Sequence, residues 1–108
     1  MKKLHIAIST NNIEATVTDY NVRLSAEPDL HIAGQYALWR TESLNLSIRQ
    51  DSKCVSGSLR HLGWEDSCVT EFTQDIDVND IVWEHFNAQN QADEINNLWP
   101  EADYSPKS

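Results

Sequence analysis

The chain has little of what marks several classes of protein: its 108 residues include only two cysteines, three glycines and three prolines. Two cysteines in a chain long enough to bury a core do not indicate a disulfide framework, so Cys54 and Cys68 are expected to be reduced thiols. With 40% hydrophobic residues, the chain is expected to fold rather than remain disordered. The sequence therefore predicts one domain over residues 1–100, followed by a flexible tail over residues 101–108.

Basic residues and long apolar runs are also scarce. Eight Lys and Arg residues stand against 17 Asp and Glu residues, which gives a formal net charge of -9 at pH 7. This charge repels phosphate backbones and anionic membrane surfaces, so neither nucleic acid nor a membrane is an expected partner. The apolar stretch after Lys2 and Lys3 is too short for a signal-peptide core or a bilayer span. We therefore expect an acidic, soluble, cytoplasmic protein.

Hydrophobic periodicity predicts the order of helices and strands. For residues 81–86, a helix over 80–99 is the rival assignment, but β-branched and aromatic residues favour a strand there. Asn87 is a good N-cap for the last helix, and Pro100 ends it. The predicted elements, in chain order, are a strand at 4–9, a helix at 12–24, a β-rich segment at 30–40 bent at Gly34, strands at 44–49 and 59–64, a hairpin of 69–76 and 81–86, and a helix at 88–98.

Three of these strands each contribute one candidate metal ligand, namely His5, His61 and Glu84, while His85 is expected to be a surface or packing residue. Neighbouring side chains of a strand point to opposite faces, so each strand can turn this residue toward a common site. Glu84 shares its face with Phe86, so we expect it to be the most buried of the three. Two imidazoles and one carboxylate form the ligand set of non-haem Fe(II) sites and, with a bound water, of many Zn(II) sites. A lone strand histidine is more often structural, so the hypothesis needs all three positions to converge.

The predicted strand at 44–49 alternates apolar and polar residues, and its polar face carries Asn45, Ser47 and Arg49. These three residues are the candidate substrate-binding residues. Ser47 and Arg49 could hold an anionic group of a substrate. A surface ion pair is the simpler alternative for Arg49.

The order of elements and these motifs resemble the vicinal oxygen chelate superfamily, which includes glyoxalase I, the extradiol dioxygenases and the fosfomycin and bleomycin resistance proteins. The likeness covers about residues 3–86. Lys3-Leu4-His5-Ile6-Ala7-Ile8 is similar to the family's first strand with its metal histidine, and Ser58-Leu59-Arg60-His61-Leu62-Gly63 to the start of its second module. Residues 77–86 are similar to the closing turn and the strand that carries the glutamate ligand. The Leu-Asn-Leu-Ser strand and the Trp-Glu pair look closest to the arsenic- and cadmium-induced group, which contains a C-As lyase.

The resemblance implies an α+β fold that begins with a βαβββ module. This chain departs from the family between His61 and the turn at Asp77, where about fifteen residues stand in place of a helix and another strand. We therefore expect a shortened second half, followed by the C-terminal helix.

The resemblance also implies that His5, His61 and Glu84 bind a divalent ion, Fe2+ or alternatively Zn2+, Mn2+ or Ni2+, for lyase or dioxygenase chemistry on a small molecule. Asn45 stands where glyoxalase-type relatives carry a further ligand. A non-catalytic protein of the same fold, which binds a drug or metal or has an accessory role, is the alternative. Because the family builds its cup from two modules, the shortened second half also predicts a homodimer.

Overall fold

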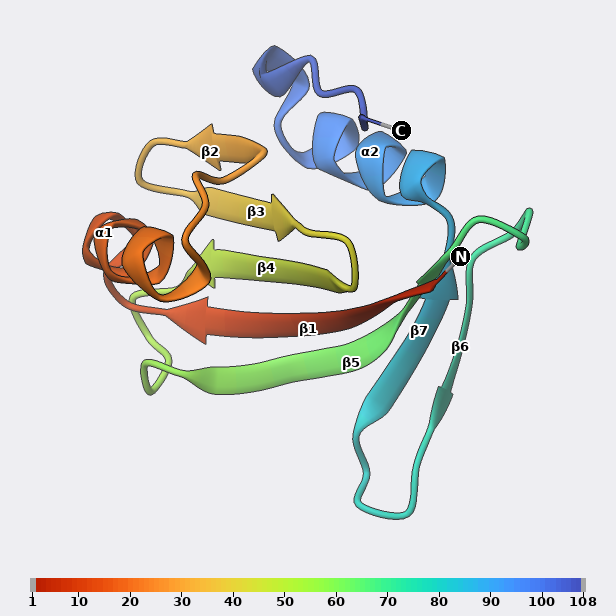
Figure 1. The fold of residues 1–108 in the computed structure, drawn as a ribbon. Helices are drawn as coiled ribbons and strands as arrows, with labels where there is room; N and C mark the ends of the chain where they lie inside the picture. Colours follow the sequence, from red (N-terminus) through yellow and green to blue (C-terminus); the bar gives the residue numbers. More distant parts are fainter. Residues whose placement is uncertain (1, 108) are drawn as a thin grey trace.

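Residues 2–107 are described by a computed structural model, in which seven strands form one sheet (Figure 1). Met1 and Ser108, which begin the expected domain and end the expected tail, lie outside the described residues. The strands are β1 (Lys2–Thr10), β2 (Leu30–Ile32), β3 (Tyr36–Arg40), β4 (Leu44–Gln50), β5 (Ser58–Asp66), β6 (Thr73–Ile76) and β7 (Val82–Phe86). The helices of this part of the chain are α1 (Ile13–Leu24), α2 (Ala88–Leu98) and the short 3-10 helix η1 (Pro100–Ala102). This mixed content is compatible with the predicted α+β class.

The strand order is β2-β3-β4-β1-β5-β7-β6, which divides the sheet into two halves. The first half, residues 2–50, contains β1 to β4 and α1; the second half, residues 58–86, contains β5, β6 and β7. The halves meet where β1 pairs antiparallel with β5. Each of these central strands has a parallel neighbour on its other side, β4 for β1 and β7 for β5. Parallel neighbours keep side chains of paired residues on one face, so rows of side chains run across the whole sheet.

The hairpin predicted near the end of the sheet is confirmed: β6 and β7 pair antiparallel, and the rival helix over 80–99 is wrong. The helix predicted at 88–98 is also confirmed. The strand predicted at 69–76 is shorter than expected and begins at Thr73. Its pairing with β7 starts with Thr73 opposite His85. Strand β7 ends at Phe86 and is followed by α2, so residues before Thr73 have no strand to pair with.

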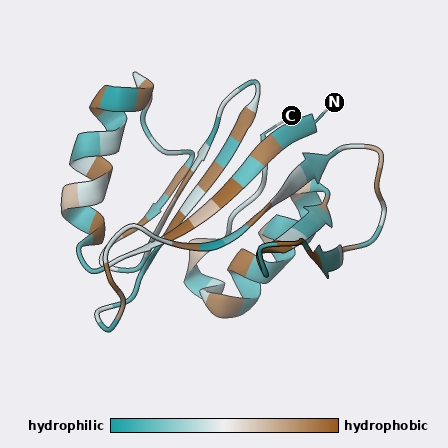
Figure 2. Ribbon diagram, turned by 90° about the horizontal axis from the view of Figure 1, so that it is seen from below, coloured by the Kyte–Doolittle hydropathy of each residue, from teal (hydrophilic) through white to brown (hydrophobic). Residues whose placement is uncertain are grey.

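The two helices cover opposite faces of the sheet (Figure 2). On one face, Ile13 and Val17 of α1 pack in a cluster with Trp39. On the other face, Ala92 and Ile95 of α2 pack with strand β3. Because α2 lies over the polar face of β4, this face belongs to the interior of the protein. Its residues therefore need partners inside the fold.

Asparagine side chains fix the beginning of both helices. The Asn12 side chain accepts a hydrogen bond from the backbone N–H of Ala15, and Asn87 forms a reciprocal capping box with Asn90. The second cap starts α2 immediately after β7 and sends it back over the sheet. Within residues 2–107, no helix has both the length and the apolar character needed to cross a bilayer.

The expected tail, residues 101–108, makes contacts with the domain as far as the structure describes it. Tyr104 is buried, and its backbone N–H donates to Asn96 Oδ1 at 2.8 Å. Arg40 Nη1 donates to the backbone oxygen of Lys107 at 2.8 Å. The segment thus extends the cover that α2 places over the sheet.

Candidate metal centre

His5, Gly63 and Glu84 lie side by side in a row that crosses β1, β5 and β7. Pairing of β1 with β5 sets His5 opposite Gly63, and pairing of β5 with β7 sets Gly63 opposite Glu84. A Cβ atom at position 63 would lie 2.2 Å from the backbone oxygen of Glu84. Only glycine therefore lets β7 approach β5 this closely. The missing side chain also leaves space in the row between His5 and Glu84.

His61 enters this space from the next row, in which it pairs with Ala7. The β1–β5 register shifts between Ala7 and Ile8, which pairs with Leu59, so Arg60 is the additional residue of a β-bulge. A bulge re-aims side chains, and here Arg60 and His61 line the same cavity instead of pointing to opposite faces. Ala7 is buried and small, so it leaves room for the imidazole rings beside it.

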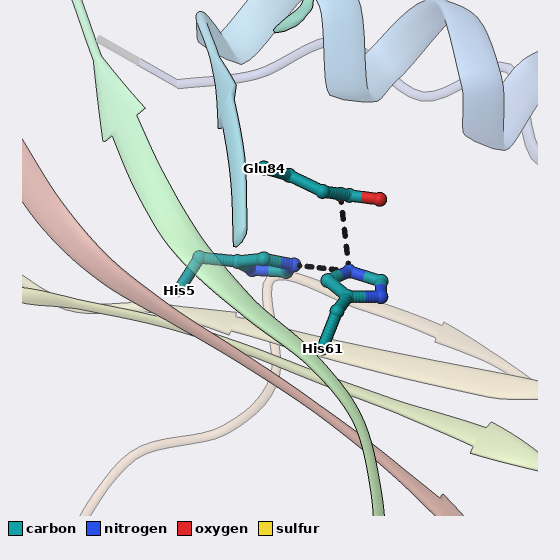
Figure 3. Close-up of side chains that lie close together, drawn as sticks. All are labelled: His5, His61 and Glu84. Carbon is teal, nitrogen blue, oxygen red and sulfur yellow. Dashed lines mark hydrogen bonds and ion pairs between the residues drawn. The ribbon is translucent and has the colours of Figure 1, made fainter. Parts of the chain in front are cut away.

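The donor atoms of the three predicted ligands converge (Figure 3). His5 Nε2 lies 2.9 Å from His61 Nε2, which lies 3.0 Å from Glu84 Oε1, and all three donors lie within 4.8 Å of one another. Two donors bonded to one metal at about 2.1 Å are about 3 Å apart at a right angle and about 3.4 Å apart at the tetrahedral angle. Both separations therefore suit ligands of one ion.

Hydrogen bonds determine which nitrogen of His5 is free to bind a metal. His5 Nδ1 lies 3.2 Å from the backbone oxygen of Asn45 and 2.9 Å from its Oδ1. A backbone carbonyl only accepts, so Nδ1 carries the proton and Nε2 keeps its lone pair. Because His5 Nε2 carries no proton, the 2.9 Å contact with His61 requires that His61 Nε2 donates one. A bound metal ion would replace this proton. Burial is the main cause that lowers the pKa of His5 to about 4, which keeps the ring in the neutral, ligating form.

Asn45 holds the His5 ring from the side opposite the other two ligands. Its Nδ2 donates to Glu65 Oε1 and to Gln91 Oε1, both at 2.8 Å. Glu65 also accepts two hydrogen bonds of 2.8 Å from Arg40. Burial raises the pKa of Glu65, but the hydrogen bonds from Arg40 and Asn45 outweigh it and place this pKa below its ordinary value. An ionised Glu65 thus orients Asn45, and Asn45 orients His5.

The structure separates the three candidate substrate-binding residues. Asn45 is fully buried and does not line the cavity beside the three ligands, whereas Ser47 and Arg49 do. Arg49 forms no ion pair within residues 2–107, so the surface ion pair considered for it is absent from that range. The cavity is small, about 30 Å³, and lies between the sheet and α2. Arg60 also lines it, although strict alternation along its strand places Arg60 and His61 on opposite faces.

The burial of the ligands differs from the expectation. His5 is the most buried of the three, with 3% of its surface exposed, while the side chains of His61 and Glu84 are each 17% exposed. The prediction that Glu84 would be the most buried is wrong, because β7 lies next to the exposed edge strand β6 and β1 lies at the centre of the sheet. The two more exposed ligands have more room to adjust around an ion.

The other two histidines and both cysteines lie outside this cavity. Cys54 and Cys68 are free thiols, as predicted. His85 Nε2 lies 2.9 Å from Asp66 Oδ2, in a pair that does not line the cavity. Glu94 also lines the cavity, but among residues 2–107 the donor atoms that converge on one point belong to His5, His61 and Glu84.

Comparison with known protein families finds no family model that matches this chain, and no curated protein matches it either.

Proposed function

We propose that the protein is a metal-dependent small-molecule enzyme of the vicinal oxygen chelate type, in which His5, His61 and Glu84 hold a divalent ion. The observation that carries this proposal is the convergence of donors from three strands within 4.8 Å beside a cavity. Two imidazole Nε2 atoms that face each other at 2.9 Å are unusual for purely structural histidines, which normally find separate acceptors. A shared metal ion gives both nitrogens the same partner.

The topology supports the family assignment. The elements β1, α1, β2, β3 and β4 follow one another in the chain, as in a βαβββ module, and their strands are ordered β2-β3-β4-β1. In the second half, β5 is followed by residues 67–72 without a helix and then by β6 and β7. This arrangement fits a second module that has lost its helix and one strand.

Different residues of the chain would have different roles at such a metal site. When bound, a divalent ion would act as a Lewis acid on an oxygen of the substrate. Asn45 fixes the ring of His5, while His61 and Glu84 complete the donor set and leave the cavity side open. Helix α2 lines the cavity with Asn90, Gln91, Glu94 and Ile95. A donor set of two nitrogens and one oxygen suits Fe2+ and also Zn2+, Mn2+ or Ni2+.

Metal analysis of the purified protein tests this proposal. We expect about one divalent ion per chain in the parent protein, and loss of that ion in His61→Ala and Glu84→Ala. His85→Ala is the matched control, because its imidazole pairs with Asp66 outside the cavity and should leave metal uptake unchanged. Equal metal content in the parent protein and both ligand variants would refute the site.

A non-catalytic binding protein is the second candidate. The shortened second half and the small cavity, about 30 Å³, favour it over an enzyme that admits a large substrate. Retained metal without turnover of a small-molecule substrate would support this candidate, whereas metal-dependent turnover would support the enzyme.

We also propose that the protein forms a homodimer through the second half. Residues 58–86 contain no helix that could cover the face of β5 and β7 opposite the cavity. Trp64 lies on this face and is 36% exposed. A second copy could cover this face with the same surface in a twofold arrangement. Light scattering at micromolar concentration should give the mass of two chains, and the mass of one chain would contradict the proposal.

A further inference from the structure

Two arginines from different strands line the same cavity as the candidate metal ligands: Arg49 on β4 and Arg60 on β5. The Nε atom of each is buried and has no hydrogen-bond partner among the described residues. Arg60 Nη2 donates to Ser47 Oγ at 3.1 Å, and the Arg49 guanidinium lies 5.6 Å from the ring centre of Trp99. Like Arg49, Arg60 forms no ion pair within residues 2–107.

A buried guanidinium N–H without an acceptor is costly, and two of them in one cavity call for a common explanation. An anion between the two side chains would supply acceptors to both. The planar guanidinium fork matches the oxygens of a carboxylate, phosphate or phosphonate group. Ser47 and Trp99 already restrain the two arginines, so little side-chain freedom remains to be lost on binding.

The charges around the cavity favour an anion once a metal ion is present. Glu84 and Glu94 also line the cavity, and they balance the two arginines. A bound divalent ion would add two positive charges and make the cavity cationic, within a chain whose formal net charge is -9. The field of such a site attracts small anions and concentrates them at the metal.

We propose that Arg49 and Arg60 bind the anionic group of the substrate, and that the substrate is a small organic acid whose adjacent oxygen reaches the metal ion. The β-bulge is what makes this possible, because it turns Arg60 into the cavity together with His61. The cavity is small, about 30 Å³, which favours a ligand of a few heavy atoms over a larger one. The role of the metal in this proposal rests on the proposed function; the arginine pair rests on its own contacts.

Calorimetric titration with two probe anions, glycolate and inorganic phosphate, tests the proposal on the full chain, both metal-free and loaded with Co2+. Arg49→Met and Arg60→Met should each weaken binding of the preferred anion roughly ten- to a hundredfold. Arg60→Lys keeps the positive charge and removes only the planar guanidinium group, so it should lower the anion affinity less than Arg60→Met does. Arg23→Met is the control, because it removes the same charge at a place away from the cavity. Arg23 lies on α1 and pairs with Asp19 at 2.9 Å.

The outcomes separate the two proposals. Anion affinities that are equal in Arg49→Met, Arg60→Met and Arg23→Met, with Co2+ uptake intact, would overturn the anion site and leave the metal site standing. If the parent protein takes up no Co2+, the metal proposal fails. Arginine-dependent anion binding to the metal-free chain would then still support the anion site, and its absence would overturn it. Tighter binding of glycolate assigns a carboxylate to the substrate, and tighter binding of phosphate assigns a phosphate or phosphonate.

Discussion

The two halves of the molecule use one sheet in different ways. In the first half, α1 covers a cluster of buried apolar residues that all come from this half: Ile13, Val17, Ala37, Trp39, Leu46 and Ile48. In the second half, residues 58–86 contain one buried hydrophobic residue, Phe86, and all four residues of β6 are exposed. Yet two of the three candidate ligands, His61 and Glu84, come from the second half. The first half thus supplies most of the core, and the second half supplies most of the site.

The largest effect should come from breaking the core of the first half. Trp39 is fully buried, and its Nε1 donates to Asn21 Oδ1 at 3.1 Å. We expect Trp39→Ala to lower the free energy of unfolding by about 3–5 kcal/mol, because it leaves a large cavity. Ile76→Ala in β6, where Ile76 is 64% exposed, should change it by less than about 1 kcal/mol. Urea unfolding followed by circular dichroism measures both; equal losses would remove the proposed difference between the halves.

A smaller effect is expected where the first half supports the site. Asn45→Leu removes the side-chain acceptor of His5 Nδ1–H at 2.9 Å, leaves the backbone oxygen at 3.2 Å and keeps a similar volume. Loss of such an orienting partner should weaken Zn2+ binding about ten- to a hundredfold. Asn21→Leu is the matched control, since Asn21 bonds Trp39 in the same half but does not line the cavity. Calorimetric Zn2+ titration gives the affinities, and an unchanged affinity in Asn45→Leu would show that His5 does not need this hydrogen bond.

The smallest effect concerns the pH dependence of the contact between the halves. Glu65 of the second half binds Arg40 and Asn45 of the first half, and these bonds hold its pKa below the ordinary 4.5. The folded state therefore favours the ionised carboxylate, and its contribution to stability is present above the unfolded pKa and lost as pH falls through the folded one. Glu65→Gln should lower the free energy of unfolding by about 1–2 kcal/mol at neutral pH.

Urea unfolding at a series of pH values checks this pH dependence. The stability difference between the parent protein and Glu65→Gln should shrink as pH falls below about 5. Glu71→Gln is the control, because Glu71 is exposed on the loop before β6. A difference that stays constant down to about pH 3 would show that the Glu65 charge does not stabilise the contact.

Local patterns were enough to predict most of the fold. The capping side chain of Asn87 and the stop at Pro100 define α2, and the alternation of apolar and polar residues defines β4. Both signals arise within a few residues of the chain, so they can be read without knowledge of the tertiary structure. The candidate ligands were also predictable, because His5, His61 and Glu84 each occupy a regular strand position.

The features of the site that the sequence did not predict depend on pairing between strands that are distant in the chain. The bulge at Arg60 arises from the register of β5 against β1, and simple alternation gives Arg60 the wrong face. The role of Asn45 likewise arises because β1 and β4 pair with His5 opposite Asn45. The need for glycine at position 63 comes from the approach of β7. Residues that position the site are thus harder to identify than the ligands themselves.

X-ray absorption spectroscopy of the Zn2+-loaded protein tests the central claim most directly, because it identifies the ligands of the ion. For a site made by His5, His61 and Glu84, we predict two imidazole ligands with nitrogen and oxygen donors at about 2.0–2.2 Å, and one imidazole fewer in His61→Ala. Sulfur donors at about 2.3 Å, or an imidazole count that is unchanged in His61→Ala, would contradict the account.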